Sequence, residues 1–438
     1  MINLHCMKPN HFLRIVVLFS VILLPLDESL ACSGYKITIG DRTFFGSNED
    51  AWRLTPHIWF EAGNEERRFG AAFTGSRSVG KNLYAPQSGM NEAGLAFERL
   101  ASYFPQDRSW NPAGLKQITN EATYLKDILH LCESVDDVKA YIDGYDHSFF
   151  IADVFLYIEP SGRYLVVEPY STTIGNEPNY VISNFCPSIT SENDAHKLTR
   201  YHNGVEFLRS GVDSTLAFCK ALSDTMHVCR EKIGDGTLLT SIWDLKYKTV
   251  NLFFYHDYNT TVQFSLTDEL MKGDHLIALS NIFPANTEFE QLRDYQVPFN
   301  NRWMAIVLLA SAGLFLFSAF FFLIRFFRTK NRATYGKLQL LLFPLGLIMF
   351  YFMFVLLTNL NVYYFSSPYV DRMNVFVSMT SYIPFLILLL IIPFLLINIG
   401  IMKKNGWSFF AVGLFTLNNL TYLILIGLFA YWKFYDVF

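Results

Sequence analysis

The chain has 438 residues, of which 51% are hydrophobic, and its mean hydropathy is positive. This composition is too apolar for an ordinary water-soluble enzyme of that length. The formal net charge is only −4 and no basic, aromatic-rich stretch is present, which argues against a nucleic-acid partner. The apolar residues gather in one short stretch near the start and in four long stretches after Trp303, with a segment of ordinary globular composition between them.

The first 31 residues have the pattern of a secretory signal peptide. A weakly positive start around Lys8 precedes the apolar segment Ile15–Leu24, and Ser29 and Ala31 place small residues where signal peptidase cleaves. Cleavage after Ala31 would leave Cys32 as the first residue, with a free α-amine.

Two other interpretations of this segment stay open. An N-terminal membrane anchor is disfavoured because the ten apolar residues of Ile15–Leu24 are too short for a hydrocarbon core of about 30 Å. A bacterial lipoprotein would carry its lipid on Cys32, but that processing prefers a large aliphatic residue where this chain has Ser29.

The exported segment opens with a predicted hairpin. Two short strands, Tyr35–Ile39 and Thr43–Gly46, flank a turn that begins at Gly40. Such a hairpin returns Asp50 to the neighbourhood of Cys32. An N-terminal cysteine can use its own α-amine as a general base if that amine is held neutral and oriented, and a nearby carboxylate can orient it. The alternative is that Asp50 only caps a turn.

Four cysteines of the exported segment could form disulfides, since an exported domain meets oxidising conditions. Three pairings are possible, and the sequence does not choose among them. No pair has the spacing of a zinc site, so we expect neither a metal nor another cofactor. The four residues are Cys132, Cys186, Cys219 and Cys229.

Helical patterns and many short strands together predict an α+β domain over residues 32–285. We expect two antiparallel sheets with helices outside them, a four-layer α/β/β/α sandwich with Cys32 at the tip of a central strand. The expected helices are Thr119–Cys132, Val135–Ile142, Ala195–Leu208 and Ser214–Leu222.

After a linker over residues 286–302, residues 303–438 are expected to form a four-helix membrane domain. Each of four apolar segments is long enough to cross a bilayer. The polar pair Asn418–Asn419 is expected to hold helices together, and the scarcity of ionisable residues favours an anchor over a carrier. The segments are Trp303–Ile324, Leu338–Thr358, Phe376–Ile401 and Phe409–Trp432.

Charges in the loops predict the orientation of these helices. Basic residues crowd the first loop, Arg325–Lys337, and Lys403 and Lys404 lie in the third, whereas the second loop, Asn361–Asn374, has only one basic residue. The positive-inside rule places the first and third loops in the cytoplasm and therefore the exported domain outside. A bacterial inner membrane, with the domain on its external side, is the expected location.

The order of several motifs between Cys32 and Asp268 resembles the choloylglycine hydrolase and penicillin V acylase family of N-terminal-nucleophile hydrolases. Cys32 followed by Gly46–Asp50 matches the family's opening Gly-x-Asn-x-Asp pattern, and Gly89–Leu95 is similar to its Gly-x-Asn-Glu-x-Gly-Leu turn. The other similar segments are Phe155–Glu168, Tyr180–Asn184 and Thr237–Tyr255.

This resemblance implies hydrolysis of a linear amide C–N bond, without a cofactor. Cys32 would attack the carbonyl carbon and its α-amine would carry the proton, held by Asp50. The side chain of Asn184 would donate to the oxyanion, with a backbone N–H near Ala101 as second donor. Arg200 matches the family's late active-site arginine. The external location at a bilayer favours a small N-acyl amide with a lipid-like acyl group.

The chain departs from the family at Ser47, where the family usually has an arginine that lowers the pKa of the thiol. Arg200 or Arg53 would then have to supply the positive charge that a thiolate needs. Two alternatives follow: a dipeptidase-like peptidase, or a non-catalytic membrane sensor or assembly protein with a degenerate hydrolase domain.

Overall fold

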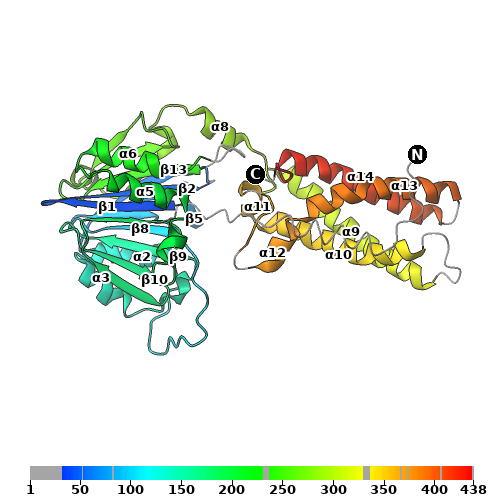
Figure 1. Ribbon diagram of the computed structural model, residues 1–438, viewed down its shortest axis with the longest axis horizontal. Coiled ribbons are helices and arrows are strands. Elements are labelled where there is room, and N and C mark those ends of the chain that lie inside the picture. The colour runs from blue at the N-terminus through cyan, green and yellow to red at the C-terminus, as the bar shows by residue number, and fades with distance from the viewer. Residues whose placement is uncertain are drawn as a thin grey trace. The chain divides into compact units, whose positions relative to one another are not determined.

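A computed structural model describes residues 32–436 except 52, 81–82, 230–235, 329–335, 366, 372–373 and 405–406. The expected signal peptide, residues 1–31, lies outside the described residues. Two compact units are present, the first ending at Asp294 and the second beginning at Tyr295. The chain is coloured in order in Figure 1.

Two antiparallel sheets form the centre of the first unit. One has the order β12-β1-β2-β13-β14-β15 and the other β11-β10-β9-β8-β7-β4-β3-β16, with a separate pair β5-β6. The first sheet contains β12 (Asn179–Ile182), β1 (Cys32–Ile39), β2 (Arg42–Ala51), β13 (Gly236–Asp244), β14 (Thr249–Phe254) and β15 (Val262–Ser265). The second contains β11 (Ser171–Gly175), β10 (Tyr164–Glu168), β9 (Asp153–Ile158), β8 (Ala96–Ala101), β7 (Ser88–Asn91), β4 (Ala71–Gly75), β3 (His57–Glu61) and β16 (His275–Ala278). The pair is β5 (Arg77–Gly80) and β6 (Leu83–Ala85).

Side chains from both sheets meet in one core, which includes Phe45 and Trp243 from the first sheet and Phe60 and Met90 from the second. Phe44, next to Phe45 on β2, lies instead in a cluster under the helices, since successive side chains of a strand point to opposite faces.

Helices cover the outer faces, α5 and α6 on the first sheet and α2 and α3 on the second, as Figure 1 shows. The predicted four-layer α/β/β/α sandwich is therefore confirmed. The helices and 3-10 turns of this unit are α2 (Glu121–Leu131), α3 (Val135–Ile142), η1 (His147–Phe150), α4 (Glu192–Ala195), α5 (Thr199–Arg209), α6 (Leu216–Met226), α7 (Leu266–Leu270), η2 (Leu279–Asn281) and α8 (Thr287–Asp294).

One expected helix is wrong in detail. The helix predicted over Ala195–Leu208 begins only at Thr199, as α5, while Ala195 ends the short helix α4; the two are separated because the backbone at Leu198 is extended, with φ −79° and ψ 107°. This break puts Arg200 in the first turn of a new helix, where it is buried. The segment 286–302, expected as a linker, contains helix α8.

The second unit has four apolar segments long enough to cross a membrane, and we describe the chain as a membrane protein on that ground. They are α9 (Arg302–Arg328), α10 (Gly336–Thr358), α12 (Val375–Thr380) with α13 (Ile383–Lys404), and α14 (Phe409–Tyr431); a short α11 (Asn361–Tyr364) follows α10. The third segment, expected as one helix, is interrupted by a turn at Ser381 and Tyr382, and α13 begins at Ile383. Asn418 donates to Ser318 Oγ at 2.9 Å and so joins α14 to α9, as predicted for the polar pair.

Candidate active site

Cys32 is the first residue of β1, a strand inside the first sheet between β12 and β2. Its side chain is 5% exposed and belongs to the core between the two sheets. The strand pairs with β2 from its first residue, Cys32 opposite Glu49, so the hairpin is longer than the sequence predicts. The extra pairs bring the Gly46–Asp50 motif directly beside the cysteine.

The backbone nitrogen of Cys32 lies in a polar cluster. It donates a hydrogen bond to Asn184 Oδ1 at 2.9 Å, and Arg200 Nη1 donates to the same oxygen at 2.7 Å. Arg200 Nη1 also lies 3.7 Å from Asp50 Oδ2. The structure thus brings together four residues that lie as far as 168 positions apart, Cys32, Asp50, Asn184 and Arg200.

Asp50 is anchored by a residue that the sequence did not single out. Thr237, near the start of β13, donates through its hydroxyl to Asp50 Oδ1 at 2.5 Å. The Thr237 hydroxyl in turn accepts the backbone N–H of Val228 at 2.9 Å. A threonine opposite the Gly46–Asp50 motif has no sequence signature, because the pairing of β13 with β2 is what places it there.

The amide orientation of Asn184 follows from its three contacts. Oδ1 faces two donors, while Nδ2 donates to the carbonyl oxygen of Ala101 at 2.6 Å. Reversing the amide would set Nδ2 against the Arg200 guanidinium, donor against donor. Ala101 is therefore next to Asn184, as expected, and contributes its carbonyl to this contact. This hydrogen bond uses one of the two hydrogens on Nδ2.

The surroundings of Cys32 disfavour the thiolate form of its side chain. Burial raises the pKa of Cys32 far above its ordinary value, and the charge of Asp50 adds to the shift, with smaller additions from Glu98 and Glu49. Gln87 Nε2 lies 3.8 Å from the sulfur and also donates to the carbonyl of Arg99. Gln87 is a second residue that no sequence pattern indicated.

Ser47, at the position of the family's arginine, faces a carboxyl group. Its hydroxyl donates to Glu98 Oε1 at 3.0 Å, and Glu98 reaches from β8 across the space between the sheets. A Cβ on Gly34, the partner of Ser47 on β1, would lie 1.6 Å from Glu98 Oε2. Burial raises the pKa of Glu98 well above its ordinary value, so this carboxyl tends to stay neutral.

Arg53 supplies positive charge near the sulfur. The thiolate of Cys32 and the carboxylate of Glu49 both favour its charged form, although burial lowers the pKa of Arg53. Glu49 itself accepts a hydrogen bond from Ser76, and burial raises the pKa of Glu49. Arg53 therefore lies near the thiol of Cys32, and Arg200 lies near its nitrogen through Asn184.

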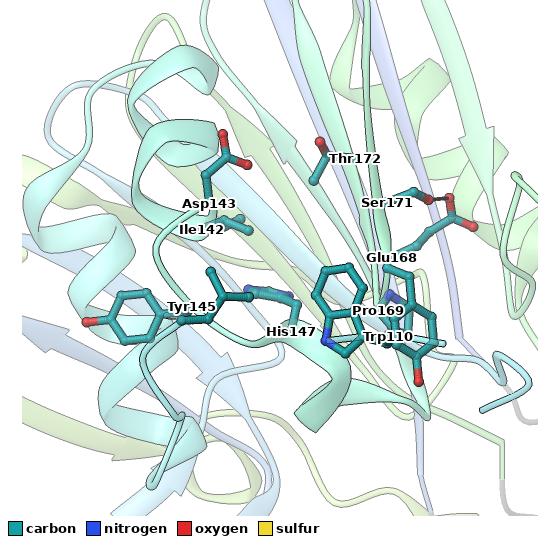
Figure 2. Close-up of a pocket in the computed structure, with 11 residues that line it drawn as sticks. Trp110, Ile142, Asp143, Tyr145, His147, Glu168, Pro169, Ser171 and Thr172 are labelled. Carbon is teal, nitrogen blue, oxygen red and sulfur yellow. Dashed lines mark hydrogen bonds between the residues drawn. The ribbon is translucent and has the colours of Figure 1, made fainter. Parts of the chain in front are cut away.

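Other cysteines and possible ligand sites lie apart from Cys32. The five cysteines among the described residues form no disulfide. A cavity of about 250 Å³, drawn in Figure 2, is lined by Trp110, Glu168 and Tyr170 among others, and none of its residues is part of the Cys32 cluster. In the part of the chain that the structure describes, one group of residues could hold a metal ion, and it does not include Cys32.

Comparison with known proteins gave no matching family model and no matching curated protein. Solved structures similar to this chain include two variants of conjugated bile acid hydrolase from Clostridium perfringens. Both are 16% identical to this chain, and the similarity covers 58% of this chain and 97% of each hydrolase chain, with TM-scores of 0.44 and 0.43. Penicillin V acylase from Agrobacterium tumefaciens is also similar, at 13% identity and a TM-score of 0.40. The similarity covers 55% of this chain and 88% of the acylase chain. The similar structures are therefore of the two enzyme types that the sequence motifs resemble.

Proposed function

We propose that this protein is an exported, membrane-anchored hydrolase that cleaves linear amide bonds with Cys32 as its N-terminal nucleophile. The observation that carries the proposal is the contact of the Cys32 nitrogen with Asn184, beside Arg200 and Asp50. After cleavage following Ala31 this nitrogen becomes an α-amine already held in place next to its own thiol.

A buried thiol with a raised pKa needs a base, and the α-amine is the base at hand. In the proposed reaction the amine accepts the thiol proton and the sulfur attacks the carbonyl carbon of the substrate amide. The resulting ammonium gives its proton to the leaving nitrogen, the C–N bond breaks, and a thioester remains on Cys32. Water, deprotonated by the same amine, attacks the thioester and releases the carboxylic acid, which restores the thiol.

Two N–H groups support an oxyanion hole in this proposal. One is the second hydrogen of Asn184 Nδ2. The other is the N–H of Ala101. Arg99, two residues earlier on β8, donates its N–H to Gln87 O at 2.7 Å. Because N–H groups alternate sides along a strand, the N–H groups of residues two apart point to the same side. The N–H of Ala101 therefore points to the side of Gln87, which is also the side of the sulfur. One such donor typically contributes roughly 10²–10³ in rate.

The proposed substrate is a small N-acyl amide with an apolar acyl group, reached from the external side of a bacterial inner membrane. Four apolar segments keep the domain at the bilayer, where such amides concentrate. The basic first and third loops support this orientation.

The test uses the full chain purified in detergent after expression in a bacterium. Mass spectrometry and N-terminal sequencing should find Cys32 as a free first residue. The protein should then release the carboxylic acid from at least one member of a panel of N-acyl amides that vary in acyl length, with penicillin V and conjugated bile acids included.

Cys32→Ser should remove this activity and the covalent labelling by an acyl-amide thiol probe. Cys132→Ala, which alters a buried cysteine packed against the helices α2 and α3, should keep both. A lipidated or uncleaved Cys32 would overturn the proposal.

A second candidate function is a non-catalytic membrane sensor or assembly protein. The observation that favours it is the environment of the Cys32 thiol, because burial and the charge of Asp50 both oppose a thiolate. Free Cys32 without hydrolysis of any panel member, and with no labelling by the probe, would favour this candidate.

A further inference from the structure

Outside the Cys32 site, three metal-ligating side chains from distant parts of the chain converge on one point. They are Cys229, just before β13, His256, just after β14, and Glu288 in α8. One donor atom from each, the sulfur, an imidazole nitrogen and a carboxylate oxygen, lies within 4.8 Å of the other two. The ligand set of thiolate, imidazole and carboxylate is typical of Zn²⁺.

His256 is held in an uncommon backbone conformation. Its φ is +44°, and that of the preceding Tyr255 is +52°, values that residues other than glycine rarely adopt. Such conformations persist only where the surroundings fix them, and they gather at functional sites. The Tyr255 ring is fully buried and packs on Phe289 with ring centroids 5.3 Å apart, which fixes the turn.

The imidazole of His256 has the arrangement of a metal ligand. Nδ1 lies 3.3 Å from the carbonyl oxygen of Thr237, and Nε2 lies 2.7 Å from Glu288 Oε2. A histidine that gives its Nδ1 hydrogen to a backbone carbonyl presents the lone pair of Nε2 to a cation. The carbonyl thus leaves Nε2, the nitrogen that faces the Glu288 carboxylate, as the metal donor.

Glu288 is placed by its helix. Asn286 Oδ1 accepts the backbone N–H of Glu288 and of Phe289, each at 3.0 Å, and so caps α8. Phe289 packs on Phe254 with centroids 4.8 Å apart, which fastens the first turn of α8 to the end of β14. The carboxylate of Glu288 therefore stays beside His256.

We propose that Cys229, His256 and Glu288 form a Zn²⁺ site with a water molecule as fourth ligand. Ligands of a tetrahedral zinc at about 2.0–2.3 Å lie roughly 3.3–3.8 Å from one another, so the three donor atoms need only shifts of about 1 Å. Binding replaces the hydrogen bond between His256 and Glu288 by two bonds to the ion, and the proton of that hydrogen bond is released to solvent. The thiol of Cys229 releases its proton to solvent and binds as thiolate.

The site joins three segments of the first unit. Cys229 belongs to the segment that pairs with Gly236, His256 follows β14, and Glu288 belongs to α8. Thr237, whose carbonyl faces His256, also holds Asp50 through its hydroxyl. A bound ion therefore stabilises the part of β13 that lies next to the Cys32 cluster, but the proposal does not depend on that cluster being catalytic.

The test uses the full chain in detergent, kept reduced, freed of metal with a chelator and then dialysed. Zinc should bind at one ion per chain and raise the Tm by several degrees. Cobalt(II) as a substitute should give the near-ultraviolet charge-transfer band of a cobalt–thiolate bond. Cys229→Ser should abolish this band, and His256→Ala and Glu288→Gln should each lower the zinc affinity at least tenfold. Glu290→Gln, on the same helix, is the matched control and should bind as the unaltered chain does.

Two outcomes would overturn the proposal. One is a reduced, folded chain that binds less than one zinc ion or shows no thiolate band with cobalt. The other is zinc binding that survives unchanged in Cys229→Ser and in His256→Ala. The Tm of each metal-free variant, compared with that of the metal-free unaltered chain, separates loss of the site from loss of the fold. Glu288→Gln keeps the cap of α8 and so remains informative if His256→Ala unfolds.

Discussion

Buried carboxyl groups define the surroundings of Cys32 at the level of single residues. Glu98 stands out because it faces Ser47, the position where the resemblance implies an arginine. An arginine there would favour the thiolate, whereas a neutral carboxyl does not. In the proposed reaction the α-amine is therefore the base, and Arg53 and Arg200 supply the positive charge.

Replacing Glu98 by glutamine should flatten the dependence of stability on pH. The folded pKa of Glu98 is raised well above the value of about 4.3 that an unfolded glutamate has. Between these two pKa values the folded chain binds more protons than the unfolded chain, so stability falls as the pH rises. Glu98→Gln cannot ionise, and its Tm should change less between pH 4.5 and pH 8.

Thermal unfolding of the full chain in detergent measures this difference. In the Glu98→Gln variant, Glu49 still contributes part of the dependence of the Tm on pH, because its pKa is also raised. Glu65→Gln, at an exposed position, is the control and should follow the unaltered chain. Parallel Tm curves for Glu98→Gln and the unaltered chain would contradict a raised pKa for Glu98.

Asn184 is the residue on which both the amine and the oxyanion depend in the proposed reaction. Asn184→Ala should lower kcat/KM on the amide that the panel identifies by roughly 10²–10³, because one donor to the oxyanion is lost. Steady-state kinetics on the processed protein measures this. Asn91→Ala is the control, since Asn91 makes a similar set of hydrogen bonds to Leu129, Cys132 and Leu95 far from the cysteine. It should lower the Tm with little effect on kcat/KM, and equal kinetic losses in both variants would contradict the assigned role.

At the level of elements, the hairpin β1–β2 depends on two glycines that make room for large side chains. Gly34 lies under Glu98, and a Cβ on Gly46 would lie 2.1 Å from the Tyr35 ring. The sequence marks Gly46 through the family motif, but only the packing of the two sheets explains Gly34.

Gly34→Ala should destabilise the first unit by about 1–3 kcal/mol, the usual cost of overpacking. In a chain that already carries Glu98→Ala most of this cost should vanish, because the carboxyl no longer occupies the space. Thermal unfolding of the two single variants and the double variant measures the coupling. Gly46→Ala serves as control, since its clash with Tyr35 should persist in the Glu98→Ala chain. A cost of Gly34→Ala that is the same in both chains would show that Glu98 does not fill this space.

For the whole molecule, the positive loops predict that the first unit lies outside the cell. A membrane-impermeant thiol reagent should label a cysteine at Val370, in the second loop, in intact cells. It should label a cysteine at Lys403, at the end of α13 that leads into the third loop, only after lysis. Both variants need a chain with Cys229→Ser, since Cys229 is exposed. Labelling of the Lys403 position in intact cells, with none at Val370, would reverse the orientation.

The sequence by itself determined what depends on local pattern and on composition. The four membrane segments follow from long apolar runs, and helix α3, which has the predicted bounds, follows from its helical pattern. The layers of the sandwich are expected from the short strands and helical patterns together with the family resemblance. The resemblance also named the four residues that the structure brings together around Cys32, namely Cys32, Asp50, Asn184 and Arg200. They could be named because each lies in or next to a short sequence motif, and these motifs follow one another along the chain in the family's order. The motifs belong to the hairpin, the end of β12 and the first turn of α5.

Only the tertiary structure decided what depends on which strands become neighbours. The pairing of β13 with β2 brings Thr237 to Asp50, and the packing of the two sheets brings Glu98 over Gly34. The cluster of Cys229, His256 and Glu288 escaped the sequence for the same reason, since its ligands have no common spacing along the chain. Side chains that meet across sheets or from distant loops are set by the fold as a whole, and no local pattern records them.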